Sequence, residues 1–138
     1  MVRFFFVLSL VVAFCHVEVF SSETKYDFVG SHFFASYYQC NPEILNDPAA
    51  IAELFKEGIG KSGATLLKIA DYQFEPYGVT LVALLSESHA SIHTYPEQGA
   101  CFVDFFTCGT SCDHTNFHQV LQQGLESKSC SHQFIHRN

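Results

Sequence analysis

One short stretch of the sequence concentrates side chains that can do covalent chemistry. Between Ser86 and Glu97 it holds several hydroxyl groups, two imidazoles at His89 and His93, and two carboxylates, all at the end of an apolar run. Polar groups placed beside a core need hydrogen-bond partners or a function. A hydroxyl nucleophile such as Ser88 with an imidazole base nearby is a recurring catalytic arrangement. These residue types favour covalent catalysis here, but they do not by themselves name a reaction.

A cysteine follows at the end of the next predicted strand. Residues 79–85 form a nearly continuous apolar run, which is typical of a buried strand, and residues 88–93 are predicted to be its short neighbour. Residues 100–107 predict another strand, which Cys108 directly follows. We therefore expect Cys108 to lie beside the Ser88 segment, so that a thiol joins the hydroxyl and imidazole groups.

The remaining elements must position this segment. Asp47 and Pro48 are signals for a helix start, and apolar residues at helical spacing continue the helix to a stop at Gly63. A second helix is predicted to begin at Asp113. Further strands are predicted at residues 26–38, 65–74 and 129–135, the last of them at a sheet edge. Together these elements predict an α+β fold, a two-layer sandwich in which two helices cover one face of a mainly antiparallel sheet.

Length and charge narrow the function. The 138 residues suit one domain with a core of its own. The formal net charge is -7 and no cluster of Lys and Arg occurs. This composition argues against a nucleic-acid partner, for which a basic surface is expected.

The first residues differ in character from the rest. A short basic start, Met1-Val2-Arg3, precedes an apolar run from Phe4 to Phe14. This run is too short to span a bilayer but is typical of a signal peptide. We predict that residues 1–22 are a signal peptide or an N-terminal extension and that residues 23–138 are the domain, with no stable membrane association. Export follows if the leader is a signal, and a cytoplasmic location if it is not.

The C-terminal part is rich in potential metal ligands. Cys112 and His114, or the i, i+4 pair His114 and His118, carry side chains that zinc prefers. The spacing nevertheless matches no closed zinc module, so we predict no metal site and a solvated, histidine-rich end. The full set is Cys112, His114, His118, Cys130, His132 and His136.

Three linked blocks of the sequence resemble the signature of the prokaryotic-type S-adenosylmethionine decarboxylases. The blocks are Glu87-Ser88-His89, His93-Thr94-Tyr95-Pro96-Glu97 and Phe105-Phe106-Thr107-Cys108-Gly109. Shorter likenesses occur at Gly30-Ser31-His32, Cys40-Asn41-Pro42, Gly63-Ala64-Thr65 and Phe74-Glu75-Pro76. A lone Glu-Ser-His would be weak, whereas three blocks at the right spacing are specific. The resemblance runs from about residue 28 to about residue 125.

The resemblance implies a self-cleaving proenzyme with a covalent cofactor. The hydroxyl of Ser88 would attack the carbonyl of Glu87, and the chain would split between these residues to leave a pyruvoyl group derived from Ser88. That group would form a Schiff base with the substrate amine and accept electrons as carbon dioxide leaves. His93 matches the proton acceptor in processing, and Cys108 matches the proton donor in catalysis.

The resemblance also implies a binding site for the nucleoside part of the substrate. Phe74 matches an aromatic residue that stacks on adenine, and Glu97 matches a carboxylate that holds the ribose hydroxyls. Tyr95 stands where the family commonly has Trp, a departure that weakens the assignment of the substrate. Thr80 stands where a serine usually supports processing, and it keeps the hydroxyl. By analogy with the family, we expect a homodimer of cleaved protomers that makes decarboxylated S-adenosylmethionine for spermidine synthesis.

Two other functions remain open on the same residues. Pyruvoyl-dependent arginine or ornithine decarboxylases would need the same Ser88, His93 and Cys108, and only Phe74 and Glu97 favour the nucleoside. An inactive, secreted binding protein of the same fold is a further alternative, which the leader favours and the complete catalytic set disfavours.

The compartment decides the state of the cysteines. In an exported enzyme, Cys40, Cys101, Cys112 and Cys130 are the candidates for two disulfides, and Cys108 stays free for catalysis. The alternative is five reduced thiols that behave as small apolar side chains.

Overall fold

The structure, a computed structural model, describes residues 28–109 and 111–138. The predicted leader, residues 1–22, lies outside these residues. The strands are β1 (Gly30–Tyr38), β2 (Leu66–Gln73), β3 (Val79–Leu85), β4 (Ser88–Tyr95), β5 (Ala100–Cys108) and β6 (Ser129–Arg137). The helices are α1 (Pro42–Leu45), α2 (Pro48–Ser62), the 3₁₀ turn η1 (Pro96–Gln98) and α3 (His114–Gly124).

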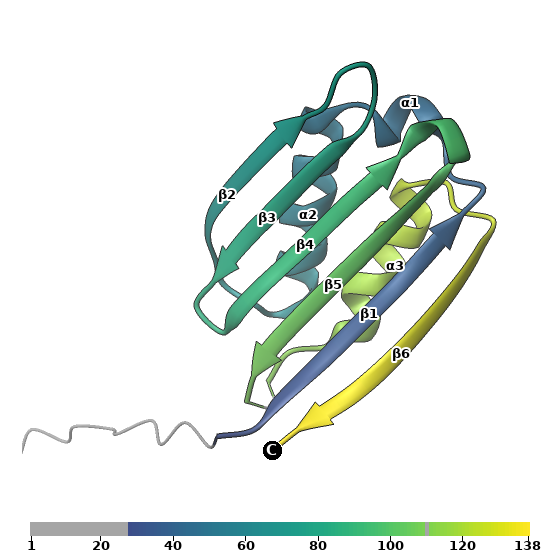
Figure 1. Ribbon diagram of the computed structural model, residues 1–138. Helices are drawn as coiled ribbons and strands as arrows, with labels where there is room; N and C mark the ends of the chain where they lie inside the picture. The colour runs from purple at the N-terminus through teal and green to yellow at the C-terminus, as the bar shows by residue number, and fades with distance from the viewer. Residues whose placement is uncertain (1–27, 110) are drawn as a thin grey trace, which may run out of the picture.

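The described strands form one antiparallel sheet in the order β2-β3-β4-β5-β1-β6. Helices α2 and α3 lie side by side across one face of it, and none of the described helices lies on the opposite face (Figure 1). The predicted fold class, a two-layer α+β sandwich, is confirmed. Strands β4 and β6 each continue two residues beyond the predicted limits and β5 continues one residue, as is common at element ends.

The local signals for the helices act as predicted. The side chain of Asp47 accepts hydrogen bonds from the N–H groups of Ala49 and Ala50, and Pro48 occupies the first turn of α2. Gly63 ends this helix with a φ of 83°, in the left-handed region that glycine adopts without a Cβ clash. Asp113 caps α3 in the same way as Asp47 caps α2.

Strand alternation divides the sheet into a buried face and an outer face. In β4, Ala90, Ile92 and Thr94 face the helices and are buried. The core between the layers contains Phe105, which stacks on Phe117 of α3 with ring centroids 4.3 Å apart. In the described part of the chain, no helix is long and apolar enough to cross a membrane.

Candidate active site

The tight turn between β3 and β4 holds the predicted cleavage site. The N–H of Ser86 donates to the carbonyl of Thr65 (3.0 Å), and the N–H of Thr65 donates to a carboxylate oxygen of Glu87 (2.8 Å). The backbone N–H of Cys108, on the next strand, donates to the carbonyl oxygen of Glu87 (2.9 Å). The carbonyl before Ser88 is therefore fixed in place and polarised by an amide donor.

The hydroxyl of Ser88 has an imidazole neighbour. Its Oγ lies 3.0 Å from Nδ1 of His89, which is exposed and packs near the ring of Phe106. His89 is one of the two imidazoles of the predicted catalytic stretch, but no role is predicted for it from the sequence. Its signal was its place in the Glu-Ser-His block, directly after the serine.

Ser88 and Cys108 line the same cavity, of about 660 Å³. The predicted neighbourhood of these two residues is thus confirmed. Arg137 also lines this cavity, with its guanidinium 4.6 Å from the ring centroid of Phe106. The sequence does not predict Arg137 at this site, because Arg137 is brought there by the register of the folded sheet, in which Gly30 pairs with both Cys108 and Arg137.

His93 lies toward the opposite end of β4, on the outer face. Its Nδ1 is hydrogen-bonded to Oγ1 of Thr80 on β3. Its ring meets those of Phe74 and Tyr95 edge-on, with centroids 5.6 and 4.8 Å away. Four residues predicted to act in processing or substrate binding therefore form one contiguous group.

The site is split into two groups along the sheet. We call Glu87, Ser88 and Cys108 the turn group, and the residues around His93 the strand group. Ser88 and His93 are five positions apart in extended chain, or about 17 Å at the usual strand rise. Within a single chain, His93 therefore lies apart from Ser88 and Cys108. Strand geometry is the reason, because each residue of an extended strand adds about 3.3 Å to the separation.

Glu97 is separate from both groups. It lies on η1 and lines a cavity of about 410 Å³ together with Tyr77, Pro96 and residues of α1. This cavity contains none of the residues that line the Ser88 cavity.

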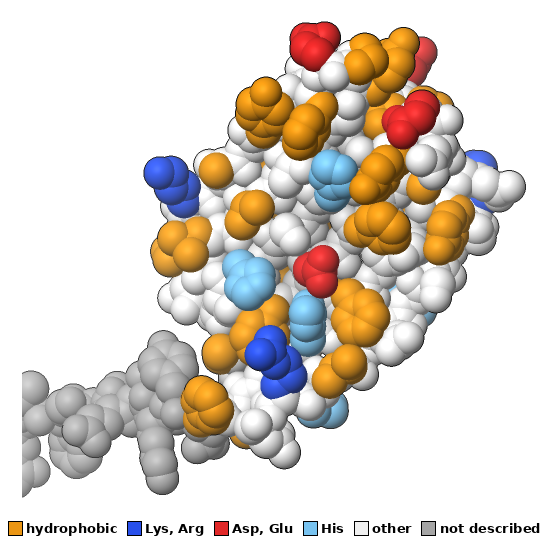
Figure 2. Space-filling model, viewed as in Figure 1, with side chains coloured by type: hydrophobic (Ala, Val, Ile, Leu, Met, Phe, Trp, Pro, Cys, Tyr) orange, Lys and Arg blue, Asp and Glu red, His pale blue; other side chains and the backbone are white. Residues whose placement is uncertain are grey.

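The outer face between the groups is apolar and exposed. Val82 and Leu84 of β3 and Phe102 of β5 are 45%, 52% and 54% exposed. Figure 2 shows hydrophobic side chains and histidines interspersed over this face of the sheet. Such a concentration of exposed apolar side chains is characteristic of a surface that another protein covers.

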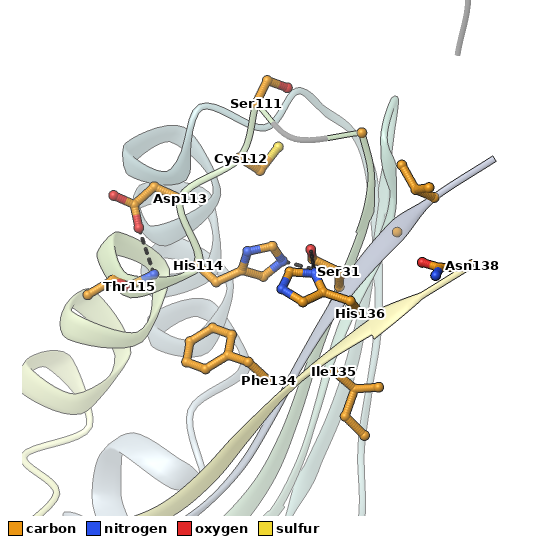
Figure 3. Close-up of a pocket in the computed structure, with 13 residues that line it drawn as sticks. Ser31, Ser111, Cys112, Asp113, His114, Thr115, Phe134, Ile135, His136 and Asn138 are labelled. Carbon is orange, nitrogen blue, oxygen red and sulfur yellow. Dashed lines mark hydrogen bonds between the residues drawn. The ribbon is translucent and has the colours of Figure 1, made fainter. Parts of the chain in front are cut away.

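A second cavity, of about 690 Å³, lies at the same end of the sheet but toward the helices. Figure 3 shows His114 and His136 pointing toward each other across it, with Ser31 between them. Oγ of Ser31 lies 3.1 Å from Nδ1 of His136, and Nε2 of His114 lies 3.3 Å from the carbonyl of Ser31. Burial lowers the pKa of His114, so the ring is held in its neutral form. The residues of the strand and turn groups do not line this cavity.

The five cysteines of the described chain are all free thiols. Cys40 and Cys101 are buried and hydrogen-bonded to each other, and this bond together with burial raises the pKa of Cys101. Cys101 and Cys130 both lie opposite Tyr37 in the sheet, whereas Cys112 lines the cavity at the far end. The alternative of two disulfides is therefore not possible in this fold, because Cys112 lies at the end of the sheet opposite the other three candidates.

Comparison with known proteins gives one consistent result. The sequence model of the S-adenosylmethionine decarboxylase family matches residues 31–138. The chain is 43% identical over 100 residues to an S-adenosylmethionine decarboxylase proenzyme of Thermosipho melanesiensis, covering 72% of this chain and 77% of the relative. It is also 43% identical over 101 residues to one of Prochlorococcus marinus, covering 73% and 81%. The crystal structure of the adenosylmethionine decarboxylase of Aquifex aeolicus superposes with a TM-score of 0.72 at 32% identity, covering 78% of this chain and 88% of that one.

Proposed function

This chain belongs to the S-adenosylmethionine decarboxylase family, and from that premise we propose that it cleaves itself at Ser88 and then decarboxylates S-adenosylmethionine. Polyamine biosynthesis is the role of this family, whose members depend on a pyruvoyl group made from one of their own serines. In this chain, that serine is Ser88.

The hydrogen bond from Cys108 N–H to the carbonyl oxygen of Glu87 carries the proposal. When Oγ of Ser88 attacks this carbonyl, negative charge develops on the oxygen that already accepts the bond. A fixed amide donor stabilises that charge without reorganising. His89, 3.0 Å from Oγ, is placed to accept the hydroxyl proton.

The remaining processing steps follow from the ester that this attack forms. Collapse of the intermediate breaks the amide bond, so that the acyl group of Glu87 moves from the nitrogen to the oxygen of Ser88. Removal of the α-proton of Ser88 then breaks its Cβ–O bond, releasing the Glu87 carboxylate and leaving dehydroalanine. Addition of water and loss of ammonia complete the pyruvoyl group.

The turn group fits this cofactor. Ser88 begins β4 at the wall of a cavity, so a new chain terminus there meets open space rather than core. The pyruvoyl group supplies an electron sink for loss of carbon dioxide. Cys108, exposed in the same cavity, is the residue that we propose returns a proton to the substrate carbon.

We further propose that the functional unit is a two-fold dimer that joins the turn group of one protomer to the strand group of the other. An isologous dimer uses the same patch on both copies, and the exposed apolar outer face is such a patch. Antiparallel face-to-face packing would set His93 of the partner subunit above Ser88, where it takes the α-proton. The separation of about 17 Å between Ser88 and His93 of one chain supports this arrangement. A general base must come within about 3 Å of the atom that carries the proton, or act through a water molecule.

The strand group would then bind the substrate beside the turn group of the other copy. Phe74 and Tyr95 present two ring surfaces about His93, which suits the flat adenine base. Thr80 holds the His93 ring by its hydrogen bond and so sets the orientation of the free Nε2. We assign the ribose hydroxyls to Glu97 on η1, the next element after Tyr95.

Intact-mass analysis of the purified protein tests the cleavage. The wild type should give two fragments that meet between Glu87 and Ser88, and Ser88→Ala should remain one chain because no hydroxyl can attack. Ser86→Ala is the matched control, since it removes a hydroxyl from the same turn and should still split. A Ser88→Ala chain that splits at this bond would refute the mechanism.

Release of carbon dioxide from three candidate substrates tests the specificity. We expect turnover with S-adenosylmethionine and not with arginine or ornithine. Phe74→Ala should raise KM for S-adenosylmethionine about 10-fold or more, because a stacking surface for the base is lost. Cleavage at Ser88 should be unaffected in that variant. Turnover of arginine or ornithine alone would keep the self-cleavage proposal and overturn the substrate.

A further inference from the structure

Three potential metal ligands meet away from the active site, between α3 and β6. They are His118, Cys130 and His132, which we call the α3–β6 cluster. The Sγ of Cys130 lies 3.9 Å from Nε2 of His118 and 3.7 Å from Nδ1 of His132. One ligand atom from each residue lies within 4.8 Å of the others.

The fold holds these side chains in place without any ion. Cys130 and His132 are two positions apart on β6, so both point to the helix side of the sheet. His118 reaches them from α3, and the ring of Phe33 packs against both imidazoles, with centroids 5.5 and 5.8 Å away. The cluster therefore joins the edge strand to the helix layer at a defined geometry.

The orientation of His118 is set by a buried hydroxyl. The phenol oxygen of Tyr37, which is fully buried, lies 2.7 Å from Nδ1 of His118. This bond turns Nε2 of the same ring toward Cys130. A partner on the second ring nitrogen is the usual companion of a metal-binding histidine, because it fixes the ring and its tautomer.

The distances suit a tetrahedral ion. With zinc–nitrogen bonds of about 2.0 Å and a zinc–sulfur bond of about 2.3 Å, a tetrahedral site separates nitrogen and sulfur by about 3.5 Å. The observed separations of 3.9 and 3.7 Å exceed this by a few tenths of an ångström. Shifts of a few tenths of an ångström in the side chains of the cluster would bring nitrogen and sulfur to this separation.

We propose that His118, Cys130 and His132 bind a zinc ion that fastens the edge strand β6 to α3. Nε2 of His118, Sγ of Cys130 and a ring nitrogen of His132 are the protein ligands. A water molecule fills the fourth position on the side where His132 is exposed. On binding, the Cys130 thiol gives its proton to solvent and the thiolate coordinates the ion.

The proposed site is separate from the chemistry at Ser88. Cys130 pairs with Tyr37 near one end of β1, whereas Cys108 pairs with Gly30 at the other end. Beyond its pairing with β1, β6 is a mostly exposed edge strand. An ion that links it to a helix adds an anchor where the fold has few buried contacts.

Cobalt titration of the untagged, full-length protein tests the site, because Co²⁺ reports thiolate ligation through a charge-transfer band in the near ultraviolet. The wild type should bind one ion per protomer with this band, and zinc should displace it. Cys130→Ser should lose the band, and His132→Gln, at an exposed position that tolerates substitution, should bind zinc at least 10-fold more weakly. Tyr37→Phe should weaken binding by about 10-fold or more while keeping the band.

Two controls remove the same chemical groups outside the cluster. Cys112→Ser removes another half-buried thiol, and His136→Gln removes another imidazole from the same face of β6. Both should keep the wild-type band and zinc affinity. Zinc should also raise the Tm of the wild type and of both controls, but not that of Cys130→Ser.

Three results would overturn the proposal. They are the absence of a thiolate band in the wild type, a band that persists in Cys130→Ser, and equal loss of zinc binding in Cys112→Ser or His136→Gln. Self-cleavage is measured on the same samples, so a failure of the zinc site is distinguishable from a failure of the proposed enzyme.

Discussion

If the strand group of one protomer completes the turn group of the other, two inactive variants should repair each other. Ser88→Ala lacks the attacking hydroxyl but keeps His93, and His93→Ala keeps Ser88 but lacks the proposed base. Each variant alone should fail to complete cleavage, with His93→Ala stopping at the ester that hydroxylamine then cuts. Co-expressed, they form mixed dimers in which one of the two sites has both residues.

The structure and the symmetry set the expected extent of repair. Five strand residues place Ser88 and His93 of one chain about 17 Å apart, which rules out direct proton transfer within that chain. Random pairing of equal amounts puts about half of the His93→Ala chains into mixed dimers, and each of these has an intact site. About half of the His93→Ala chains should therefore be cleaved to completion, and none of the Ser88→Ala chains.

Intact-mass spectrometry reads the result, with a short tag on one variant to tell the chains apart. The control replaces the Ser88→Ala partner with a chain that carries both substitutions and so offers no His93. No repair is expected from that pair. Absence of repair in the first pair, with mixed dimers isolated through the tag, would mean that His93 does not act across an interface and would refute the two-fold arrangement.

Four further outcomes follow from the same contacts. Cys108→Ala should still cleave itself at least in part, because the backbone N–H of residue 108 remains. Its kcat should fall about 100-fold or more in an assay of carbon dioxide release, and an unchanged kcat would remove the thiol from the mechanism. Phe117→Ala should lower the free energy of unfolding by about 3–5 kcal/mol in urea titrations, because the buried ring of Phe117 packs on those of Phe105 and Phe55. A loss below about 1 kcal/mol would contradict this packing. The pKa of His114 is lowered in the folded chain, so protonation of this ring favours the unfolded chain. Its contribution to stability is complete above the unfolded pKa of about 6.5 and is lost as pH falls below that value. Between about pH 7.5 and 5.5, the urea midpoint should therefore drop less in His114→Gln than in the wild type. Deletion of residues 1–22 should leave a protein that folds, as measured by circular dichroism, and that cleaves itself, as measured by mass. Thiol counting on the denatured product should find five free thiols, or three if Cys40 and Cys101 are oxidised to a disulfide.

Local signals predicted most of the fold. The capping residues Asp47 and Asp113 each act through atoms two or three positions away, so the sequence alone locates the helix starts. The apolar run at residues 79–85 matches the bounds of β3, but the strand is buried on one face only, because Val82 and Leu84 point to the exposed outer face. The predicted layer arrangement followed from these elements.

The active site was predictable only in part. The pairing of β4 with β5 brings Cys108 to Ser88, as expected for neighbouring strands in sequence. The distance between Ser88 and His93 was already implied by the predicted strand that holds both, because extended chain rises about 3.3 Å per residue.

The sequence by itself determined the elements, the alternation of each strand and the identity of the reactive serine. All of these depend on residue types close together in the chain. Only the tertiary structure decided that Cys112 cannot join a second disulfide, that Arg137 reaches the Ser88 cavity and that His118 meets Cys130 and His132. Each of these depends on strand order and register, which bring together side chains as far apart in sequence as Ser88 and Arg137. Pairing of β6 with β1 rather than with its sequence neighbour follows from burial over the whole sheet, and no local pattern encodes it.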